Sequence, residues 1–311
     1  MRILIVKPSS LGDIVHAMVV VSELKRQRPD CIIDWVVGDR FFDIVDQSKI
    51  AQRVLIYERH GNLSSIFRLI SEIRRQNYDY VFDMQGLARS GIMTYFAKSP
   101  HKVGRKDSRE LSFLAYTETV NYPGPVHAVD ILKEFLNTVG CNDEVSGMVP
   151  ELRNISSPVY REFLESKVPS KDFVCVFPES RGPKKEWEYF GELIPEILTA
   201  QPNTSVLLLG SRTNKITDTD SDHFFDLRGQ TSLADLVFLI KNARLVVAND
   251  SGPLHISAAL ERPTLGLFTI TDPSRSGPYP AYKESNVALR LSNQPSEIGI
   301  ILQTIVEMLS N

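Results

Sequence analysis

The segment Lys7–Asp13, with the sequence KPSSLGD, joins a short apolar run to a helical pattern and ends in a carboxylate. It has neither the Gly-Lys-Ser/Thr ending of a P-loop nor the G-x-G-x-x-G dinucleotide fingerprint. A carboxylate at the start of a helix is stabilised by the helix dipole and stays ionised. This suits a general base that takes a proton from a hydroxyl group. Asp13 could also simply cap the helix, and one residue can do both; we interpret it as a candidate base.

A second polar turn, Asn249–His255 (NDSGPLH), lies between a strand-like run and a helical one. Ser251 and Gly252 would present backbone N–H groups at the positive end of that helix, which is an anion site. An ordinary capped helix would explain the turn equally well. However, His255 lies in the first helical turn and would point back toward the same spot, which favours a contact with a pyrophosphate.

A third polar segment, Pro178–Trp187 (PESRGPKKEW), follows a strand-like run and leads into a helix. It holds three cations, Arg181, Lys184 and Lys185. Surface lysines are usually just solvated, but cations are unfavourable at a helix N-terminus. A bound polyphosphate would remove this conflict, so we expect an anion here.

Two further segments need an interpretation. Residues 89–109 are rich in cations, and a solvated face would explain them, but we expect them to steer an anionic partner. These cations are Arg89, Lys98, His101, Lys102, Arg105, Lys106 and Arg109. The triplet Asp218–Asp220 has the D-x-D form that holds a divalent metal in some enzymes. It lies in a polar stretch with no strand leading into it, so we interpret it as a solvated loop and assign no metal.

The elements that must position these loops alternate between strand and helix. In the first half, we predict strands at residues 2–6, 32–37, 53–57 and 79–83, and helices at 14–27, 39–47, 63–76, 87–97 and 127–139. In the second half, we predict strands at 173–177, 205–209, 244–247 and 264–268, and helices at 187–200, 232–241, 253–260 and 295–309. Continuous apolar strands between amphipathic helices indicate parallel sheets covered on both faces. Ligands of such sheets bind beyond the carboxyl ends of the strands, which is where the three loops lie.

The composition predicts a protein of two domains. A chain of 311 residues with 42% hydrophobic residues can bury two ordinary cores. The irregular segment 141–158 reads as the linker, so we predict domains at 1–150 and 151–311. The predicted fold class is α/β, with two doubly wound Rossmann-like domains facing each other across a cleft.

Charge and cysteine content narrow the functional classes. The net charge of −3 gives no sign of nucleic-acid binding. The three scattered residues Cys31, Cys141 and Cys175 fit reduced thiols better than a disulfide framework. No signal peptide and no run of about 20 apolar residues is visible. We therefore expect a cytoplasmic protein, with peripheral contact at the inner membrane surface as a further expectation.

Together these segments resemble glycosyltransferase family 9, the ADP-heptose:lipopolysaccharide heptosyltransferases, and in particular heptosyltransferase I. Residues 7–13 are similar to the family pattern K-x-S-S-x-G-D, and Asp83–Ser90 (DMQGLARS) to D-x-Q-G-L-x-K-S. Further similar segments are Lys185–Trp187 (KEW), Asn249–His255 and Thr271–Pro273 (TDP). The matches span nearly the whole chain in the family's order. Two departures stand out: Thr269-Ile270 replaces a Gly-Pro pair, and Ser180-Arg181 replaces a Thr-Thr pair.

The resemblance implies a GT-B fold, inversion at the anomeric carbon, no metal and no cofactor, with ADP-heptose as co-substrate. It implies that Asp13 is the base that activates a hydroxyl of Kdo-lipid A. The implied donor-binding residues are Ser180, Arg181, Lys185, Asp226, Asp250, Ser251, Gly252 and His255. Of these, Lys185, Ser251, Gly252 and His255 would hold the diphosphate, Asp250 the heptose and Asp226 the ribose. The candidate acceptor-binding residues are Ser9, Ser10, Gly12, Arg59, Gln85, Arg89, Lys98, Arg105 and Arg109.

Other classes of protein remain open at this point. One is a GT-B enzyme that uses another nucleotide sugar or acceptor. A second is a nucleotide-sugar epimerase of the same two-domain shape, which would need no separate acceptor patch. A third is a bilobal binding protein without chemistry, which would have no use for an ionised Asp13. A dehydrogenase is disfavoured because the glycine fingerprint is absent.

Overall fold

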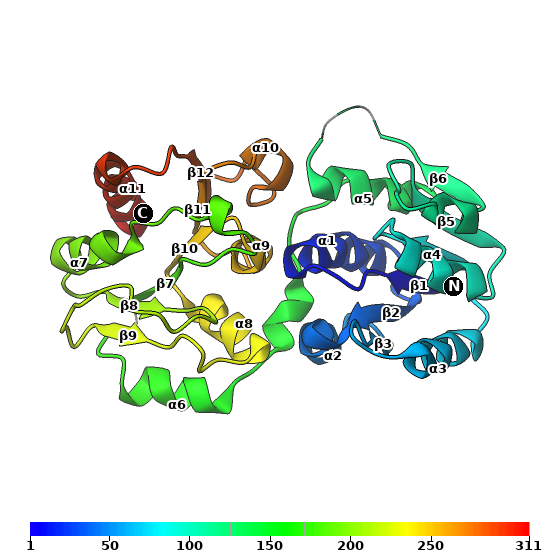
Figure 1. Cartoon of the computed structure of the whole chain (residues 1–311), viewed down its shortest axis with the longest axis horizontal. Coiled ribbons are helices and arrows are strands. Elements are labelled where there is room, and N and C mark those ends of the chain that lie inside the picture. The colour runs from blue at the N-terminus through cyan, green and yellow to red at the C-terminus, as the bar shows by residue number, and fades with distance from the viewer. Residues whose placement is uncertain (123, 125, 171, 311) are drawn as a thin grey trace. The chain divides into compact units, whose positions relative to one another are not determined.

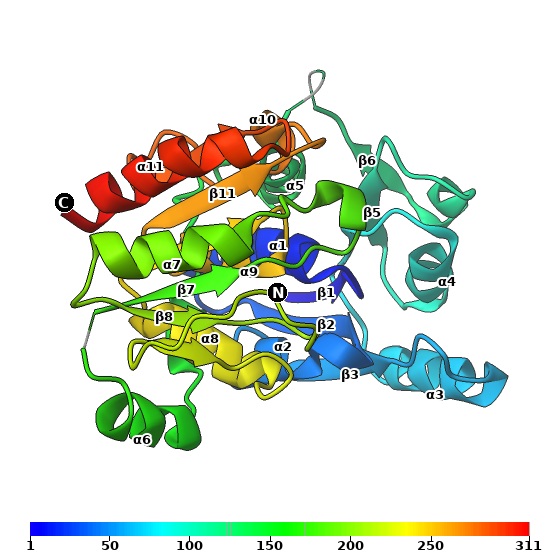
Figure 2. The ribbon, with the colours of Figure 1, turned by 60° about the vertical axis from the view of Figure 1, so that its left-hand side comes forward.

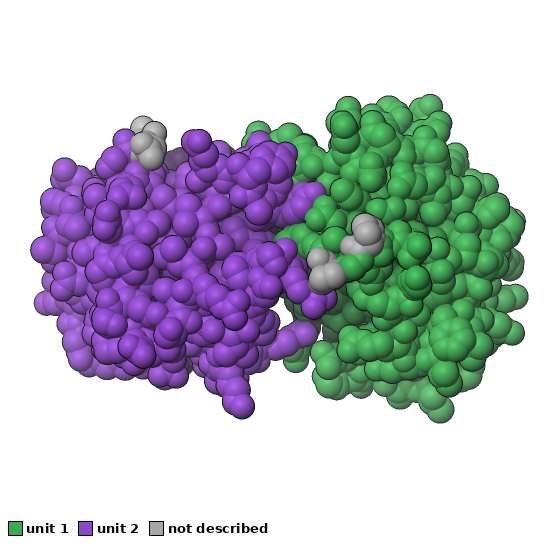
Figure 3. Space-filling model, turned by 90° about the horizontal axis from the view of Figure 1, so that it is seen from above, with its two compact units in different colours: residues 1–154 green, residues 155–311 purple. Residues whose placement is uncertain are grey.

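The computed structural model describes residues 1–122, 124, 126–170 and 172–310 (Figure 1). The chain divides into two compact units, Met1–Asn154 and Ile155–Asn311, which Figure 3 shows in green and purple. The sequence analysis placed the division at residue 150. Each unit is an α/β structure with its own parallel sheet.

Within its described residues, the first unit has six strands and five α-helices. The strands are β1 (Arg2–Val6), β2 (Ile32–Gly38), β3 (Arg53–Tyr57), β4 (Tyr80–Asp83), β5 (His101–Arg105) and β6 (Glu118–Val120). The helices are α1 (Leu11–Gln27), α2 (Phe42–Ser48), α3 (Leu63–Arg74), α4 (Ala88–Phe96) and α5 (Ala128–Asn137), with 3₁₀ turns η1 (Asp39–Phe41), η2 (Ser112–Ala115) and η3 (Pro150–Asn154). The strand order is β3-β2-β1-β4-β5-β6, with all neighbours parallel.

The centre of this sheet is the apolar run that begins the chain. Ile3, Leu4, Ile5 and Val6 are fully buried, because β1 has a neighbour on each side and helices over both faces. In register, Ile3 lies opposite Ile33 of β2 and Tyr80 of β4. The following helix, α1, is buried from Ile14 to Leu24. The start of the chain is therefore the rigid base for the loop at residues 7–10.

The second unit repeats the plan. Its strands are β7 (Phe173–Phe177), β8 (Ser205–Leu208), β9 (Phe224–Asp226), β10 (Leu245–Asn249), β11 (Thr264–Phe268) and β12 (Asn286–Arg290). Its helices are α6 (Pro158–Ser166), α7 (Phe190–Ala200), α8 (Leu233–Asn242), α9 (Gly252–Ala259), α10 (Pro273–Ser276) and α11 (Ile298–Ser310), with 3₁₀ turns η4 (Pro183–Lys185) and η5 (Pro295–Glu297). The strand order is β12-β11-β10-β7-β8-β9, again parallel throughout.

Helices cover both faces of this second sheet (Figures 1 and 2). The helices α7 and α11 lie side by side over one face, and α8 and α9 pack together on the other. Under α7 and α11, the buried side chains of Phe190, Ile197, Ile301 and Ile305 join those of the strands in one apolar core. Burial of this kind, at about 25 cal/mol per Å² of apolar surface, is the main source of stability of such a layer.

The predicted α/β class with two doubly wound parallel sheets is confirmed, with differences in the strands away from the sheet centres. The four strands that the sequence analysis did not predict are β5, β6, β9 and β12. Three of them are short or outer strands with mixed polar composition, and β5 (HKVGR) contains only one apolar side chain that is fully buried, Val103. Strands of this kind lack the apolar pattern that reveals central strands. The helix α6 was also missed, since its first residue falls at the end of the predicted linker 141–158.

None of the helices in the described part of the chain is long and apolar enough to cross a lipid bilayer.

Candidate active site

In each unit, the motif-bearing loops leave the two central strands at the point where the strand order reverses. Strand β1 leads into Lys7–Asp13 and its neighbour β4 leads into Asp83–Ser90. In the second unit, β7 leads into Pro178–Trp187 and its neighbour β10 leads into Asn249–His255. In doubly wound sheets this switch point is where ligands bind, because the two following loops diverge to opposite faces. The topology thus brings the predicted motifs together in pairs.

Asp13 lies in the first turn of α1. The helix begins at Leu11, three residues earlier than the sequence predicts, so Ser10 is the N-cap and Asp13 the third helical residue. Oδ2 of Asp13 accepts hydrogen bonds from the backbone N of Ser10 at 3.0 Å and from Ser10 Oγ at 2.6 Å. The cap role that the sequence left open for Asp13 therefore belongs to Ser10, and the carboxylate reaches back toward it.

A buried lysine controls the charge of this carboxylate. Lys7 is 2% exposed, and its Nζ donates to the carbonyl of Met84 at 2.9 Å. Burial lowers the pKa of Lys7. Burial alone would raise the pKa of Asp13, but the charge of Lys7, the two hydrogen bonds from Ser10 and the nearby His16 outweigh it and hold that pKa well below its usual range. Asp13 is therefore ionised at neutral pH.

The loop after β4 is fixed by a second buried carboxylate, Asp83. Its Oδ1 accepts from the backbone N of Gln85 and of Gly86, each at 2.9 Å, and its Oδ2 accepts from the hydroxyl of Tyr116 at 2.8 Å. Burial raises the pKa of Asp83. Gly86 has a φ of +70°, a left-handed conformation that favours glycine. Asp83 thus shapes the turn that presents Gln85.

Ser9 connects the two loops of the first unit. Its backbone N donates to Oε1 of Gln85 at 3.1 Å, and its Oγ accepts from Nη2 of Arg89 at 3.3 Å. Nε of Arg89 is buried and has no hydrogen-bond partner within the described residues. The structure therefore brings three predicted acceptor residues into one hydrogen-bonded group beside Asp13.

The nine predicted acceptor residues divide into two groups. Those that follow the carboxyl ends of β1, β3, β4 and β5 share the edge of the sheet that carries Asp13; they are Ser9, Ser10, Gly12, Arg59, Gln85, Arg89, Arg105 and Arg109. Lys98 is exposed and lies between the end of α4 and the start of β5, at the opposite edge. His101 and Lys102 also lie at that amino end of β5.

The sequence predicts that the cations of the basic segment 89–109 act as one patch. The structure shows that they do not lie together. Strand β5 runs through the middle of the segment and separates these cations to opposite edges of the sheet. Two neighbouring cations of the segment, Arg105 and Lys106, are bound to polar side chains. Arg105 binds both carboxylate oxygens of Asp107, at 2.9 and 2.7 Å, and Lys106 donates to Oδ1 of Asn121 at 3.2 Å.

In the second unit, an ion pair joins the two central loops. Nζ of Lys185 lies 2.6 Å from Oδ2 of Asp250, which also accepts from Oγ1 of Thr271 at 2.8 Å. Ser180 Oγ donates to the backbone carbonyl of Asp250 at 2.7 Å. Asp250 is 7% exposed and Lys185 is 35% exposed in its side chain. The carboxylate is therefore held inside the loops, and the lysine side chain remains partly exposed.

The backbone near Lys185 differs from the prediction. The expected helix at 187–200 begins only at Phe190, and Lys185 belongs to the short turn η4. The cause is Asn249, whose Oδ1 accepts from the backbone N of Trp187 at 3.0 Å and whose Nδ2 donates to the carbonyl of Pro178 at 2.6 Å. The predicted conflict between these cations and the start of an α-helix is therefore wrong, and Lys185 instead forms an ion pair with Asp250.

The start of α9 fits an anion site. Ser251 is the N-cap and Gly252 the first helical residue, so the positive end of the helix dipole lies at this turn. Oγ of Ser251 is buried without a hydrogen-bond partner within the described part of the chain. His255 is buried in the first turn of the same helix. A buried polar atom without a partner commonly marks a site that a ligand or water completes.

The remaining predicted donor residues lie at the same carboxyl edge. Arg181 is exposed in the loop after β7. Asp226 ends the outer strand β9, where Arg228 binds its two carboxylate oxygens at 2.9 and 2.6 Å. The hydrogen bonds from Arg228 are the main reason that the pKa of Asp226 is lowered.

Two residues that position these loops have no role in the sequence analysis. Glu179 accepts from the backbone N of Ser211 at 2.9 Å and of Arg212 at 2.7 Å. Glu186 accepts from the backbone N of Ser180 at 2.8 Å and from Arg212 Nη2 at 2.6 Å. Both carboxylates lie inside the segment 178–187, but their partners are over 25 residues away or in the loop itself, which no local pattern reveals.

No group of three or more His, Cys, Asp or Glu side chains arranged to hold a metal ion occurs within the described ranges. Asp218 of the D-x-D triplet is highly exposed and forms an ion pair with Lys215. The solvated-loop interpretation of this triplet is consistent with that environment.

Comparison with known proteins defines the class. The family model described as glycosyltransferase family 9 (heptosyltransferase) matches residues 66–298. The solved structure of "E. coli heptosyltransferase WaaC with ADP" superimposes with a TM-score of 0.80 at 23% identity, covering 99% of this chain and 100% of that one. The fold is therefore GT-B, and the protein is a glycosyltransferase.

The chain belongs to glycosyltransferase family 9. Among curated relatives, it is similar to "Lipopolysaccharide core heptosyltransferase OpsX" of Haemophilus influenzae, with 26% identity over 286 residues, 88% of this chain and 81% of that protein. A second solved structure, "E. coli heptosyltransferase WaaC with ADP-2-deoxy-2-fluoro heptose", has a TM-score of 0.77 at 23% identity and covers 99% of both chains.

Proposed function

We propose that this protein is a lipopolysaccharide-core heptosyltransferase that transfers a heptose from ADP-heptose to Kdo-lipid A with inversion at the anomeric carbon. The observation that carries the proposal is Asp13, an ionised carboxylate in the first turn of α1 at the switch point of the first sheet. Membership of family 9 and the names of the relatives support the donor and acceptor classes.

In the proposed reaction, Asp13 removes the proton from an acceptor hydroxyl. The oxygen attacks the anomeric carbon and forms the new glycosidic bond, while the bond from that carbon to the ADP oxygen breaks. The proton stays on Asp13 until solvent takes it, and ADP leaves with the electron pair. Attack from the face opposite to the leaving group inverts the anomeric centre. A positioned base contributes about 10²–10⁴-fold to such a step.

The second unit stabilises the leaving group in this proposal. Lys185 and the start of α9, at Ser251 and Gly252, bind the diphosphate together with His255, because positive charge placed where negative charge develops lowers the barrier. Asp250 contacts the heptose and Asp226 the ribose. Ser180 and Arg181 lie in the same loop as Lys185 and complete the donor side.

The first unit binds the acceptor in this proposal. The predicted acceptor cations at the carboxyl edge are Arg59, Arg89, Arg105 and Arg109. They suit a phosphorylated, Kdo-bearing glycolipid, since guanidinium groups pair well with phosphate and carboxylate. The remaining predicted acceptor residues at this edge are Ser9, Ser10, Gly12 and Gln85. Lys98 is not part of this group, because it lies at the other edge of the sheet.

The proposal includes metal independence and no cofactor, since Lys185 and a helix terminus supply the positive charge for the diphosphate. The test is product formation from Kdo-lipid A and a panel of nucleotide sugars, analysed by mass spectrometry with and without excess EDTA. Heptosylated product from ADP-heptose alone, formed equally with EDTA, supports it. Transfer from another sugar, isomerised donor without transfer, or binding without chemistry would each favour one of the alternative classes. Loss of transfer with EDTA, restored by Mg²⁺ or Mn²⁺, would refute metal independence.

A further inference from the structure

Helix α4 has apolar side chains on its exposed face as well as on its buried one. Its inward side is formed by the buried residues Ser90, Gly91, Met93 and Thr94. Its outward side carries Ile92, Tyr95 and Phe96, whose exposed fractions are 48%, 62% and 40%. A surface helix normally presents polar residues to water, and Arg89 is the only charged residue in α4. The outward stripe of α4 therefore needs an explanation.

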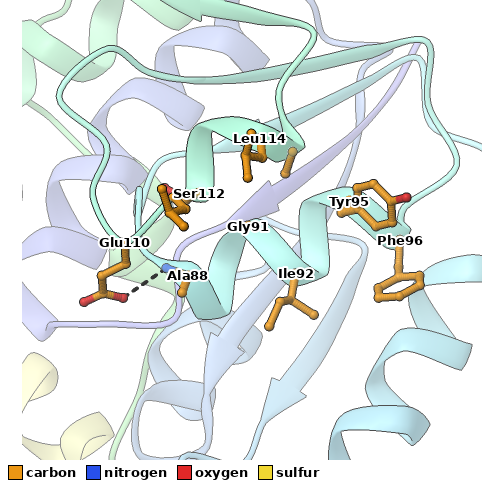
Figure 4. Close-up of a pocket in the computed structure, with 10 residues that line it drawn as sticks. Ala88, Gly91, Ile92, Tyr95, Phe96, Glu110, Ser112 and Leu114 are labelled. Atoms are coloured by element: carbon orange, nitrogen blue, oxygen red, sulfur yellow. Dashed lines mark hydrogen bonds between the residues drawn. The ribbon is translucent and has the colours of Figure 1, made fainter.

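The turn η2 extends this apolar surface. Leu111, Phe113 and Leu114 are exposed to 67%, 51% and 70%. The helix and the turn pack closely at Gly91, where a Cβ atom would lie 3.0 Å from Cα and Cβ of Ser112. Between them is an open, mainly apolar pocket of about 250 Å³ (Figure 4). We call this surface the α4–η2 face; its members are Ile92, Tyr95, Phe96, Leu111, Phe113 and Leu114.

Single exposed apolar residues are common and need no special account. Six large ones on two packed elements, around a pocket, form a patch of the kind that marks an interaction site.

Cations surround one end of the α4–η2 face. Nζ of Lys102 donates to the carbonyl of Tyr95 at 2.6 Å and lies 5.6 Å from the centre of its ring. Nη1 of Arg74 donates to the carbonyl of Phe96 at 3.2 Å, and Lys98 is exposed just beyond the helix. These positions are at the C-terminal end of α4, where the helix dipole favours positive charge. At the other end, Glu110 accepts from the backbone N of Ala88 at 3.0 Å. Its negative charge therefore lies at the N-terminus of α4, where the helix dipole stabilises it.

Apolar and aromatic side chains beside lysine and arginine are the composition of surfaces that lie on membranes. The apolar groups enter the boundary between headgroups and acyl chains, aromatic rings occupy the interface, and cations bind lipid phosphates. The α4–η2 face has all three components. It is also continuous with the predicted acceptor residues, since α4 begins beside Arg89, which binds Ser9.

We propose that the α4–η2 face is the surface by which this protein lies on an anionic lipid bilayer. Ile92, Leu111 and Leu114 enter the acyl boundary, Tyr95 and Phe96 lie at the interface, and Lys98, Lys102 and Arg74 contact lipid phosphates. Helix α4 then connects the bilayer to Arg89 and so to the loop of Asp13. This last link, from bilayer to acceptor, rests on the proposed function; the binding itself does not.

The test measures binding of the full chain to vesicles, with no turnover required. Sedimentation with vesicles of phosphatidylglycerol and phosphatidylethanolamine is compared with vesicles of phosphatidylcholine. The variant combines Ile92→Gln with Leu114→Gln, and the matched control combines Val159→Gln with Tyr282→Gln, two residues of the second unit that are 71% and 79% exposed. We expect the wild type and the control to bind the anionic vesicles, and the variant to bind at least tenfold more weakly. Lys98→Gln should weaken binding to anionic vesicles only.

Three results would overturn the proposal. They are unchanged binding of the variant, equal loss in the control, and a concentration-dependent dimer that the same two substitutions abolish, which would assign the face to a second copy. Transfer to a water-soluble, acyl-free acceptor separates this proposal from the proposed function. It should be equal in wild type and variant, whereas a chain that is no heptosyltransferase would show no transfer in either, whatever its vesicle binding. Both substituted side chains are exposed, and a melting curve checks that the variant is folded.

Discussion

Nζ of Lys185 lies 2.6 Å from Oδ2 of Asp250, across the two loops that leave the central strands of the second sheet. Thr271 and Ser180 hold the same aspartate by hydrogen bonds. The side chain of Lys185 is thus already fixed before any anion binds. Little further side-chain entropy is therefore lost on binding. Asp250 both fixes Lys185 and, in the proposed reaction, contacts the sugar.

From this arrangement we predict that Lys185→Ala weakens ADP binding by about 1.5–3 kcal/mol, the size of a hydrogen bond to a charged group. This is roughly a 10- to 150-fold increase in Kd. Isothermal titration calorimetry measures it. Lys184→Ala is the matched control, because its side chain is the exposed neighbour of Lys185 and should leave the Kd unchanged. Unchanged affinity in Lys185→Ala would remove this residue from the donor site.

A second prediction concerns the two edges of the first sheet. Neutralising Arg89 and Arg109 to Gln should raise the KM for a water-soluble, acyl-free acceptor and reduce its dependence on salt, with the donor KM nearly constant. Lys98→Gln should leave both KM values alone, because Lys98 lies at the opposite edge. A change in the donor KM, or an equal effect of Lys98→Gln, would contradict this assignment.

Gly91 gives a prediction about stability. In Gly91→Ala the added methyl group would press on Ser112, so α4 and η2 must separate. Overpacking of this kind costs about 1–3 kcal/mol in the free energy of unfolding, and the helix preference for alanine over glycine offsets up to about 1 kcal/mol of this cost. Gly299 is the second residue of α11, and in Gly299→Ala no atom lies within 4 Å of the new Cβ, so this control has the preference without the contact and should be slightly more stable than wild type. Denaturant unfolding measures both; a neutral Gly91→Ala would show that the contact yields easily.

The central strands and the motifs were predictable from sequence, because they combine buried apolar runs with polar turns. Strands β1, β7 and β11 have the predicted bounds. The outer strands β6, β9 and β12 were not predicted, since a short or partly polar strand at a sheet edge has no distinctive pattern, whereas the mainly apolar outer strand β3 was predicted with its observed bounds.

The geometry of the site depends on contacts that are distant in sequence. Lys7 binds the carbonyl of Met84, and Trp187 binds Asn249, over separations of 77 and 62 residues. The first contact buries the lysine that keeps Asp13 ionised, and the second delays the start of α7. Neither follows from local propensity. The basic segment was misread for the same reason, because β5 separates its cations to opposite edges of the sheet.

The low pKa of Asp13 predicts a difference in acid stability. Because the pKa of Asp13 in the folded state lies below the ordinary aspartate value of about 3.9, the charged form contributes stability above that value, and this contribution is lost as the pH falls through the lower folded pKa. The difference in unfolding free energy between wild type and Asp13→Asn should therefore be constant from pH 7 to about 5 and shrink below about 4. Urea unfolding at each pH measures it. A difference that grows toward low pH would contradict the account of the carboxylate.

The most direct test of the account is kcat for heptose transfer by Asp13→Asn. Asparagine keeps the size of the side chain and an oxygen that can accept from the backbone N of Ser10, but it cannot take a proton. The loss of charge removes a helix-dipole contribution of about 0.3–1 kcal/mol and also the attraction to Lys7 that lowers the pKa of Asp13, so a melting curve is recorded to show that the variant is folded at the assay temperature. With ADP-heptose and Kdo-lipid A, the account predicts that kcat of the folded variant falls by roughly 10²–10⁴-fold, with nearly normal ADP binding. A variant that melts normally and still transfers heptose within a few-fold of wild type would contradict the role of Asp13 as the base.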